Sequence, residues 1–253
     1  MKKTVLTLVL VLLLSMFCGC HSTPPADDPV IPTNDPTNVA TQPTQAPTQA
    51  PTQTQPTEAG ESHVVYSEAV EDFMQPLEAH SWERTEDIEF VMLHFTSAVV
   101  NNRKDPFNIA AIREIYHFYD VSVHYIIGRD GTVYCYIPED RAAWHAGEGE
   151  FLEDDKYTDK MNLYSIGIEL LGIGSEEDMA DYLLPEEYAQ LDPSVIGFTD
   201  AQYEALGKLL EDICSRYDIP MDREHIIGHS DYAVYSTDPG ELLDWSRVIP
   251  ESE

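Results

Sequence analysis

The chain has 253 residues and a formal net charge of −32 at pH 7. Such an excess of negative charge repels anionic polymers, so we expect no nucleic-acid partner. Solvation of the protein surface accounts for most of these carboxylates.

The first 20 residues have the composition of a secretory signal. Two lysines follow Met1, and an apolar run then continues that is too short for a confident membrane span. The end of this segment, Phe17-Cys18-Gly19-Cys20, resembles the lipobox of bacterial lipoproteins, which implies cleavage before Cys20 and acylation of its thiol. The alternatives are an ordinary signal cut near Gly19 and an uncleaved anchor.

Residues 21–62 are rich in Pro, Thr and Gln and contain the near-repeat PTQAPTQAPTQTQPT. Without an aliphatic cluster this segment cannot offset the entropy cost of folding, so we expect a disordered tether. An acylated Cys20 on such a tether predicts an extracytoplasmic protein that is anchored to the cell membrane and faces the cell wall. Residues 63–253 then form one domain, which we expect to be monomeric.

The first half of this domain contains strand and helix signals. Residues 89–94 form an apolar run that predicts a buried strand ending at His94. Asp105 and Pro106 suit the N-cap and first turn of a helix, and apolar residues follow at helical spacing up to Tyr119. Residues 121–127 and 132–137 alternate as two strands of a hairpin.

The second half continues the alternation. Residues 141–147 predict a loop, and residues 164–171 predict a strand. On that strand Ser165, Gly167 and Glu169 share one face, where the small residues leave room for a group to approach the carboxylate.

Two helices and a last strand follow. Residues 185–191 suggest a short helix, and the capping box Thr199–Gln202 starts a long one that closes at residues 218–220. Residues 225–228 predict a strand that delivers His229. The alternation predicts an α/β fold with a mixed central sheet flanked by helices.

Cys135 and Cys214 are the cysteines that remain in the domain, and each sits in an apolar pattern that suits a buried thiol. We expect no disulfide between them. His117, on a predicted helix, and His124, in a predicted strand, are interpreted as structural.

Three residues suggest a metal site. His94 and His229 each follow an apolar strand, and neighbouring strand ends in one sheet would bring both imidazoles together. Asp238 precedes the turn pair Pro239-Gly240 and adds a carboxylate, giving a ligand set typical of a catalytic Zn²⁺ with a fourth position for water. Taken singly, each histidine has a core or surface role as its alternative.

Four sequence blocks resemble the zinc-dependent N-acetylmuramoyl-L-alanine amidases, whose fold is shared with peptidoglycan recognition proteins. The blocks read VMLHFTS, SVHYIIGRDGTVYCYIPEDRAAWHAG, NLYSIGIELLG and IIGHSD…TDPG, and they extend over about residues 88–247. The resemblance implies Zn²⁺ bound by His94, His229 and Asp238. It also implies hydrolysis of the bond between muramic acid and L-alanine in peptidoglycan, in cell-wall remodelling or turnover.

Two catalytic roles follow from that resemblance. Glu169 falls on the position of a catalytic glutamate, which would accept a proton from water and pass it to the leaving amine. Its alternative is to orient a metal-bound histidine. Ser236 stands where many members have lysine, and Ser236 or Thr237 would then stabilise the oxyanion; Tyr235 could also reach in.

Three further positions fall on substrate-facing positions of the family: Trp144 and His145 of the WHAG motif, and Asn162 before the strand. Packing is the alternative for Trp144 and His145. The runner-up function is a peptidoglycan-binding or sensing lipoprotein with little or no catalysis, which Ser236 favours. A metalloprotease is disfavoured because no HExxH motif occurs.

Overall fold

The computed structural model describes residues 66–73 and 78–249. The predicted signal (1–20), its acylation site Cys20 and the predicted tether (21–62) lie outside the described residues. Within the described residues, no helix combines the length and the apolar character that a membrane crossing requires.

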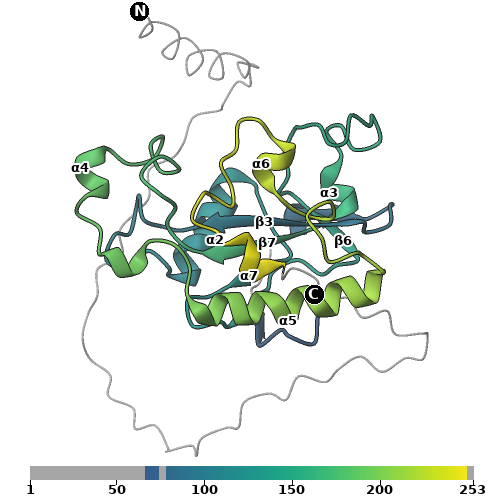
Figure 1. The fold of residues 1–253 in the computed structure, drawn as a ribbon, viewed down its shortest axis with the longest axis horizontal. Coiled ribbons are helices and arrows are strands. Elements are labelled where there is room, and N and C mark those ends of the chain that lie inside the picture. Colours follow the sequence, from purple (N-terminus) through teal and green to yellow (C-terminus); the bar gives the residue numbers. More distant parts are fainter. Residues whose placement is uncertain (1–65, 74–77, 250–253) are drawn as a thin grey trace, which may run out of the picture. The chain divides into compact units, whose positions relative to one another are not determined.

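A mixed six-stranded sheet forms the centre of the described fold, in the order β1-β5-β4-β7-β3-β8 (Figure 1). Its strands are β1 (Asp72–Phe73), β3 (Phe90–Thr96), β4 (Tyr125–Ile127), β5 (Val133–Cys135), β7 (Ser165–Leu171) and β8 (Ile226–Gly228). The β4–β5 pair is antiparallel, and the other pairs are parallel. A separate antiparallel pair joins β2 (Ser81–Glu83) to β6 (Arg141–Ala143).

Helices flank this sheet, as the sequence predicts. The two long ones are α2 (Ile109–Tyr119) and α5 (Asp200–Tyr217). The short ones are η1 (Glu78–His80), α3 (Met161–Tyr164), α4 (Pro185–Tyr188), η2 (Pro193–Val195), α6 (His229–Tyr232) and α7 (Trp245–Val248).

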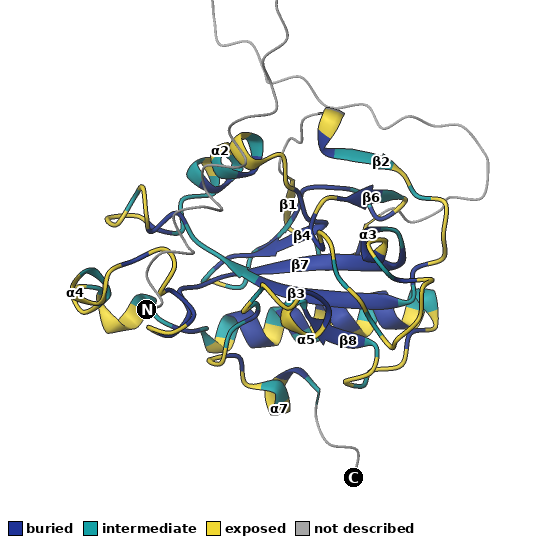
Figure 2. Ribbon diagram, turned by 90° about the horizontal axis from the view of Figure 1, so that it is seen from above, coloured by how far each residue is buried: buried dark blue, intermediate teal, exposed yellow. Residues whose placement is uncertain are grey.

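The two faces of the central strands have different partners. Alternate side chains of β3 and β7, such as Leu93 and Ile168, pack with the apolar side of α5, which includes Leu206 and Leu210. Figure 1 shows α5 running along the sheet, and Figure 2 shows β3, β4 and β7 as buried. The opposite face carries His94 and is free of α5, so it is the face on which a site can form.

The start of α5 confirms the predicted capping box. The Thr199 hydroxyl accepts the N–H of Gln202, and the Gln202 side chain accepts the N–H of Thr199. Gln202 is fully buried, and its amide also donates to the carbonyls of Ile127 and Leu171, at the ends of β4 and β7. One side chain therefore fixes the helix against two strands.

The predicted start of α2 is wrong. Asp105 does not cap the helix, which begins at Ile109 after the N-cap Asn108, because the Asn108 side chain accepts the N–H of Ala111. Asp105 instead accepts a hydrogen bond from the Asn108 amide, within the preceding turn.

Several predicted elements are shorter in the structure. The hairpin strands cover only β4 and β5, and the helix predicted at 185–191 is the single turn α4. The predicted loop 141–147 begins with β6, which owes its strand conformation to pairing with β2. Local sequence does not encode that pairing.

Candidate active site

The sheet register brings two histidines together. β8 lies beside β3 in parallel, with Leu93 opposite Gly228, so His94 in β3 and His229 directly after β8 are neighbours. Their ring centroids are 4.8 Å apart. This is the meeting of strand ends that the sequence suggests.

Asp238 reaches the same point from the loop that follows α6. Its Oδ2 lies 3.4 Å from Nδ1 of His94 and 3.5 Å from Nδ1 of His229. The Ser230 N–H donates to the Asp238 carbonyl at 2.8 Å, which closes the loop onto the start of α6. One potential ligand atom from each of the three residues thus lies within 4.8 Å of the others.

These separations suit a shared Zn²⁺. Ligand atoms at the usual distance of about 2.1 Å from a tetrahedral zinc lie about 3.4 Å apart. Nε2 of His229 lies 2.9 Å from the Ala146 carbonyl, to which it can only donate, so Nδ1 carries the lone pair. That Nδ1 is buried and has no hydrogen-bond partner in the part of the chain that the structure describes, as expected of an atom placed to ligate.

The electrostatics of the group favour a cation. Burial lowers the pKa of His94, which keeps the imidazole neutral and able to coordinate. Burial alone would raise the pKa of Asp238, but the neighbouring imidazoles of His229 and His94 hold it below the ordinary value. The site therefore offers a neutral nitrogen from His94 and an anionic oxygen from Asp238, beside Nδ1 of His229.

Glu169 stands beside this group. It lies opposite His94 in the register of β7 and β3, is buried, and its Oε2 has no hydrogen-bond partner among the described residues. Burial, followed by the negative charge of Asp238, raises its pKa well above the ordinary value, and the nearby Tyr116 hydroxyl offsets this in part. An unpaired buried carboxyl with a raised pKa is a candidate proton carrier.

The three residues predicted to face the substrate, Trp144, His145 and Asn162, differ in their exposure to solvent. Trp144 is 47% exposed and packs on Trp82, with ring centroids 4.1 Å apart. His145 and Asn162 are buried, and the Asn162 side-chain oxygen accepts the N–H groups of His145 and Ala146. The contacts of Asn162 thus hold the loop in place, while Trp144 keeps an accessible face.

Ser236 lies in the loop that carries Asp238. Its hydroxyl oxygen accepts the Asp238 N–H at 3.1 Å, which leaves the hydroxyl hydrogen free to donate. The exposed Tyr235 ring packs edge-on against His229 at a centroid distance of 6.0 Å. Thr237 is exposed on the same loop.

Sequence reasoning did not assign a role to Asp178. Its carboxylate accepts hydrogen bonds from the N–H and hydroxyl of Ser175 and from the N–H of Glu241, three residues beyond Asp238. The acidic run from residue 176 concealed it, because Asp178 is buried while Glu176 is exposed. No signal in the sequence separates the two.

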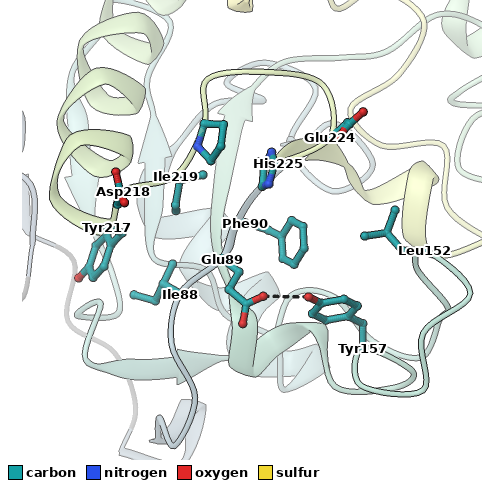
Figure 3. Close-up of a pocket in the computed structure, with 11 residues that line it drawn as sticks. Ile88, Glu89, Phe90, Leu152, Tyr157, Tyr217, Asp218, Ile219, Glu224 and His225 are labelled. Carbon is teal, nitrogen blue, oxygen red and sulfur yellow. Dashed lines mark hydrogen bonds between the residues drawn. The ribbon is translucent and has the colours of Figure 1, made fainter.

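A pocket of about 280 Å³ lies at the opposite end of β3 (Figure 3). Ile88, Glu89 and Phe90 line it, and Glu89 accepts a hydrogen bond from Tyr157 across it. It opens where β3 begins, whereas His94 lies towards the end of that strand. The pocket is therefore separate from the His94–His229–Asp238 group.

The profile of the Amidase_2 family, described as N-acetylmuramoyl-L-alanine amidase, matches residues 84–241, which is more than half of the chain and includes all three candidate ligands. This chain belongs to that family. The protein is similar to the 1,6-anhydro-N-acetylmuramyl-L-alanine amidase AmpD of Enterobacter cloacae, with 36% identity over 128 residues. That match covers 50% of this chain and 54% of the relative.

This chain is also similar to the N-acetylmuramoyl-L-alanine amidase AmiD of Escherichia coli (strain K12), with 29% identity over 140 residues. The match covers 52% of this chain and 44% of that protein. The chain spans about half the length of these curated relatives. A solved structure of an AmpD derivative aligns with a TM-score of 0.50 at 23% identity, covering 74% of this chain and 96% of that one. That likeness supports the fold.

Proposed function

We propose that this protein is a zinc-dependent amidase that hydrolyses the amide bond between N-acetylmuramic acid and L-alanine in peptidoglycan or in muropeptides. The observation that carries the proposal is the convergence of His94, His229 and Asp238 beside the unpaired carboxyl of Glu169. Membership of the family and the printed activities of the relatives support the same reaction.

His94 and His229 would hold the zinc through Nδ1, and Asp238 through Oδ2. When bound there, Zn²⁺ supplies a Lewis acid that acidifies a water molecule and polarises the amide carbonyl. The anionic Asp238 would offset part of the ion's charge, and the buried ring of His94 restricts the approach of solvent from its side. The protein's own groups must then move protons and bind the substrate.

Glu169 is the proposed proton carrier. Its Oε2 accepts the proton that the attacking water loses and then passes it to the nitrogen of L-alanine, which leaves as an amine. A carboxyl whose pKa lies above the ordinary value is better matched to this exchange near neutral pH than an exposed glutamate is. The alternative role of Glu169, orienting a ligand histidine, receives no support from its unpartnered oxygen.

Ser236 is the proposed donor to the oxyanion that develops on the carbonyl oxygen. Its hydroxyl hydrogen is not used by the Asp238 backbone, so it remains available. Trp144 offers an exposed aromatic face, of the kind that sugar rings favour, for binding the glycan or the stem peptide.

We also propose that the protein acts outside the cytoplasm, anchored through a lipid on Cys20, and reaches the wall by the 21–62 segment. The composition of residues 1–62 supports this placement. It would serve wall remodelling or turnover as a monomer.

A peptidoglycan-binding sensor is the second candidate, because Ser236 supplies a neutral hydroxyl where many family members have a lysine cation. The two are separated by incubating the protein with purified peptidoglycan, with and without a chelator. New L-alanine N-termini that require zinc support the enzyme. Binding without cleavage at full zinc occupancy favours the sensor.

A further inference from the structure

His145 is enclosed between a candidate zinc ligand and a serine of β7. Its Nδ1 lies 3.1 Å from Nε2 of His94, and its Nε2 lies 3.3 Å from the hydroxyl of Ser165. The Ser165 hydroxyl lies 2.7 Å from the Met161 carbonyl. These contacts form a continuous chain from the backbone to His94, and His145 is only 8% exposed.

The chemistry of the groups fixes the donor and the acceptor in each of these hydrogen bonds. A carbonyl can only accept, so Ser165 gives its single hydrogen to Met161 and must accept from Nε2–H of His145. Nδ1 of a neutral His145 is then an acceptor, and it takes the hydrogen of His94 Nε2. The lone pair of His94 is thereby left on Nδ1, the atom that faces Asp238.

The sheet is shaped to admit the His145 ring. A Cβ placed on Gly167 would lie 2.6 Å from the ring, so any larger residue there would displace it. Gly167 stands between Ser165 and Glu169 on the same face of β7, which explains the small residues on that face. Asn162 fixes the backbone of the loop at the other side.

We propose that Ser165 and His145 are positioning residues, which hold His94 in the tautomer that presents Nδ1 to the metal. This proposal rests on the proposed zinc site. It gives the WHAG histidine a role towards the metal instead of the substrate. Partners of this kind typically change metal affinity by about 10- to 100-fold when they are removed.

The first test reads the tautomer of His94 in the metal-free protein by nitrogen NMR of the imidazoles. In the wild type we expect the hydrogen on Nε2. Ser165→Ala removes the acceptor for Nε2–H of His145, so the hydrogen of His145 can move to Nδ1 and be donated to Nε2 of His94. We therefore expect a mixture of the two His94 tautomers in this variant. A wild type with the hydrogen on Nδ1, or a Ser165→Ala protein unchanged from wild type, overturns the proposal.

The second test measures zinc affinity by competition with a chromogenic chelator, at equal concentrations of folded protein. We expect Ser165→Ala and His145→Leu to weaken binding about 10- to 100-fold. His145→Asn, whose amide oxygen can accept from His94, should recover most of it. If His145→Leu does not fold, Ser165→Ala and His145→Asn still decide the question.

His80→Leu is the matched control. His80 is also buried and hydrogen-bonded, to the Tyr136 hydroxyl, but none of its contacts among residues 66–73 and 78–249 is with a candidate ligand. It should lower stability without changing zinc affinity. Failure of the wild type to bind zinc would contradict the proposed function. Unaltered zinc affinity in the Ser165 and His145 variants would contradict the positioning role alone.

Discussion

His94 and Glu169 stand directly opposite each other on the neighbouring parallel strands β3 and β7. Their side chains share the face that α5 does not cover, because Leu93 and Ile168 on the same strands point to α5. Side-chain direction alternates along a strand, so a slip of one residue would turn either group into the α5 core. The register is thus what places a carboxyl beside the candidate metal ligands.

We expect Glu169→Gln to abolish most amidase activity while zinc still binds. The amide cannot accept the proton of the attacking water, and removal of a general base typically costs about 10²- to 10⁴-fold in rate. Release of L-alanine N-termini from purified peptidoglycan measures the activity, and metal analysis measures the zinc content. Glu176→Gln, at an exposed site, serves as the control. Activity that survives in Glu169→Gln would show that another group is the base.

The parts of the site that were predictable are those encoded locally. Strands β3, β7 and β8 follow from their apolar runs, and His94 and His229 from their positions near strand ends. The environment of His145 was not predictable. Its ring fits only because Gly167, in the separate strand β7, has no side chain, and local sequence around His145 does not show that contact.

In the fold, too, some features could be predicted from local sequence and others could not. The capping box of α5 was predictable from Thr199 and Gln202 alone. The start of α2 was not, since Asp105 and Asn108 are both good caps by residue type and only the bond to Ala111 distinguishes them.

Ser236→Ala tests the proposed oxyanion donor. Loss of such a donor costs about 10²- to 10³-fold in kcat where it is the main one. Because the Ser236 oxygen also accepts the Asp238 N–H, zinc affinity must be measured beside kcat. A fall in kcat at unchanged zinc occupancy supports the donor role. A fall that disappears at saturating zinc would assign Ser236 to the shape of the loop alone.

Cys135 and Cys214 should resist alkylation in the folded protein. Burial raises the pKa of the Cys135 thiol to about 12 and that of Cys214 to about 11. A raised thiol pKa means less thiolate at any given pH, so at pH 8.5, where an exposed cysteine is about half ionised, these two remain protonated. Peptide mapping after iodoacetamide treatment measures the labelling of each of the two thiols. Rapid labelling before denaturation would contradict the prediction.

Gln202→Ala should lower the free energy of unfolding by about 2–4 kcal/mol. The variant loses the capping contact to Thr199 and the buried side-chain donor to the Ile127 carbonyl, and it leaves the Leu171 carbonyl with the longer bond from Arg129 at 3.3 Å. Denaturant unfolding measures the change. Glu211→Ala, exposed on the same helix, should stay within about 0.5 kcal/mol of wild type. Equal effects of the two variants would argue against this role for Gln202.

Asp178→Ala should loosen the loop that carries Asp238. The substitution removes the acceptor for Ser175 and for the Glu241 N–H, and a lost charged acceptor costs about 1.5–3 kcal/mol. Its carboxylate also lies against Gly240, two residues beyond Asp238, where a Cβ would meet Oδ2 at 2.8 Å. We therefore expect both lower stability and weaker zinc binding, because Asp238 would have to be ordered at the moment the ion binds.

Asp181→Ala is the matched control, since Asp181 is exposed in the same segment. If Asp178→Ala lowers the unfolding free energy but leaves zinc affinity at the wild-type value, the segment stabilises the fold without supporting the ligand loop. Weaker zinc binding in Asp178→Ala alone would instead show that the acidic segment after β7 takes part in building the metal site, through one buried carboxylate among several exposed ones.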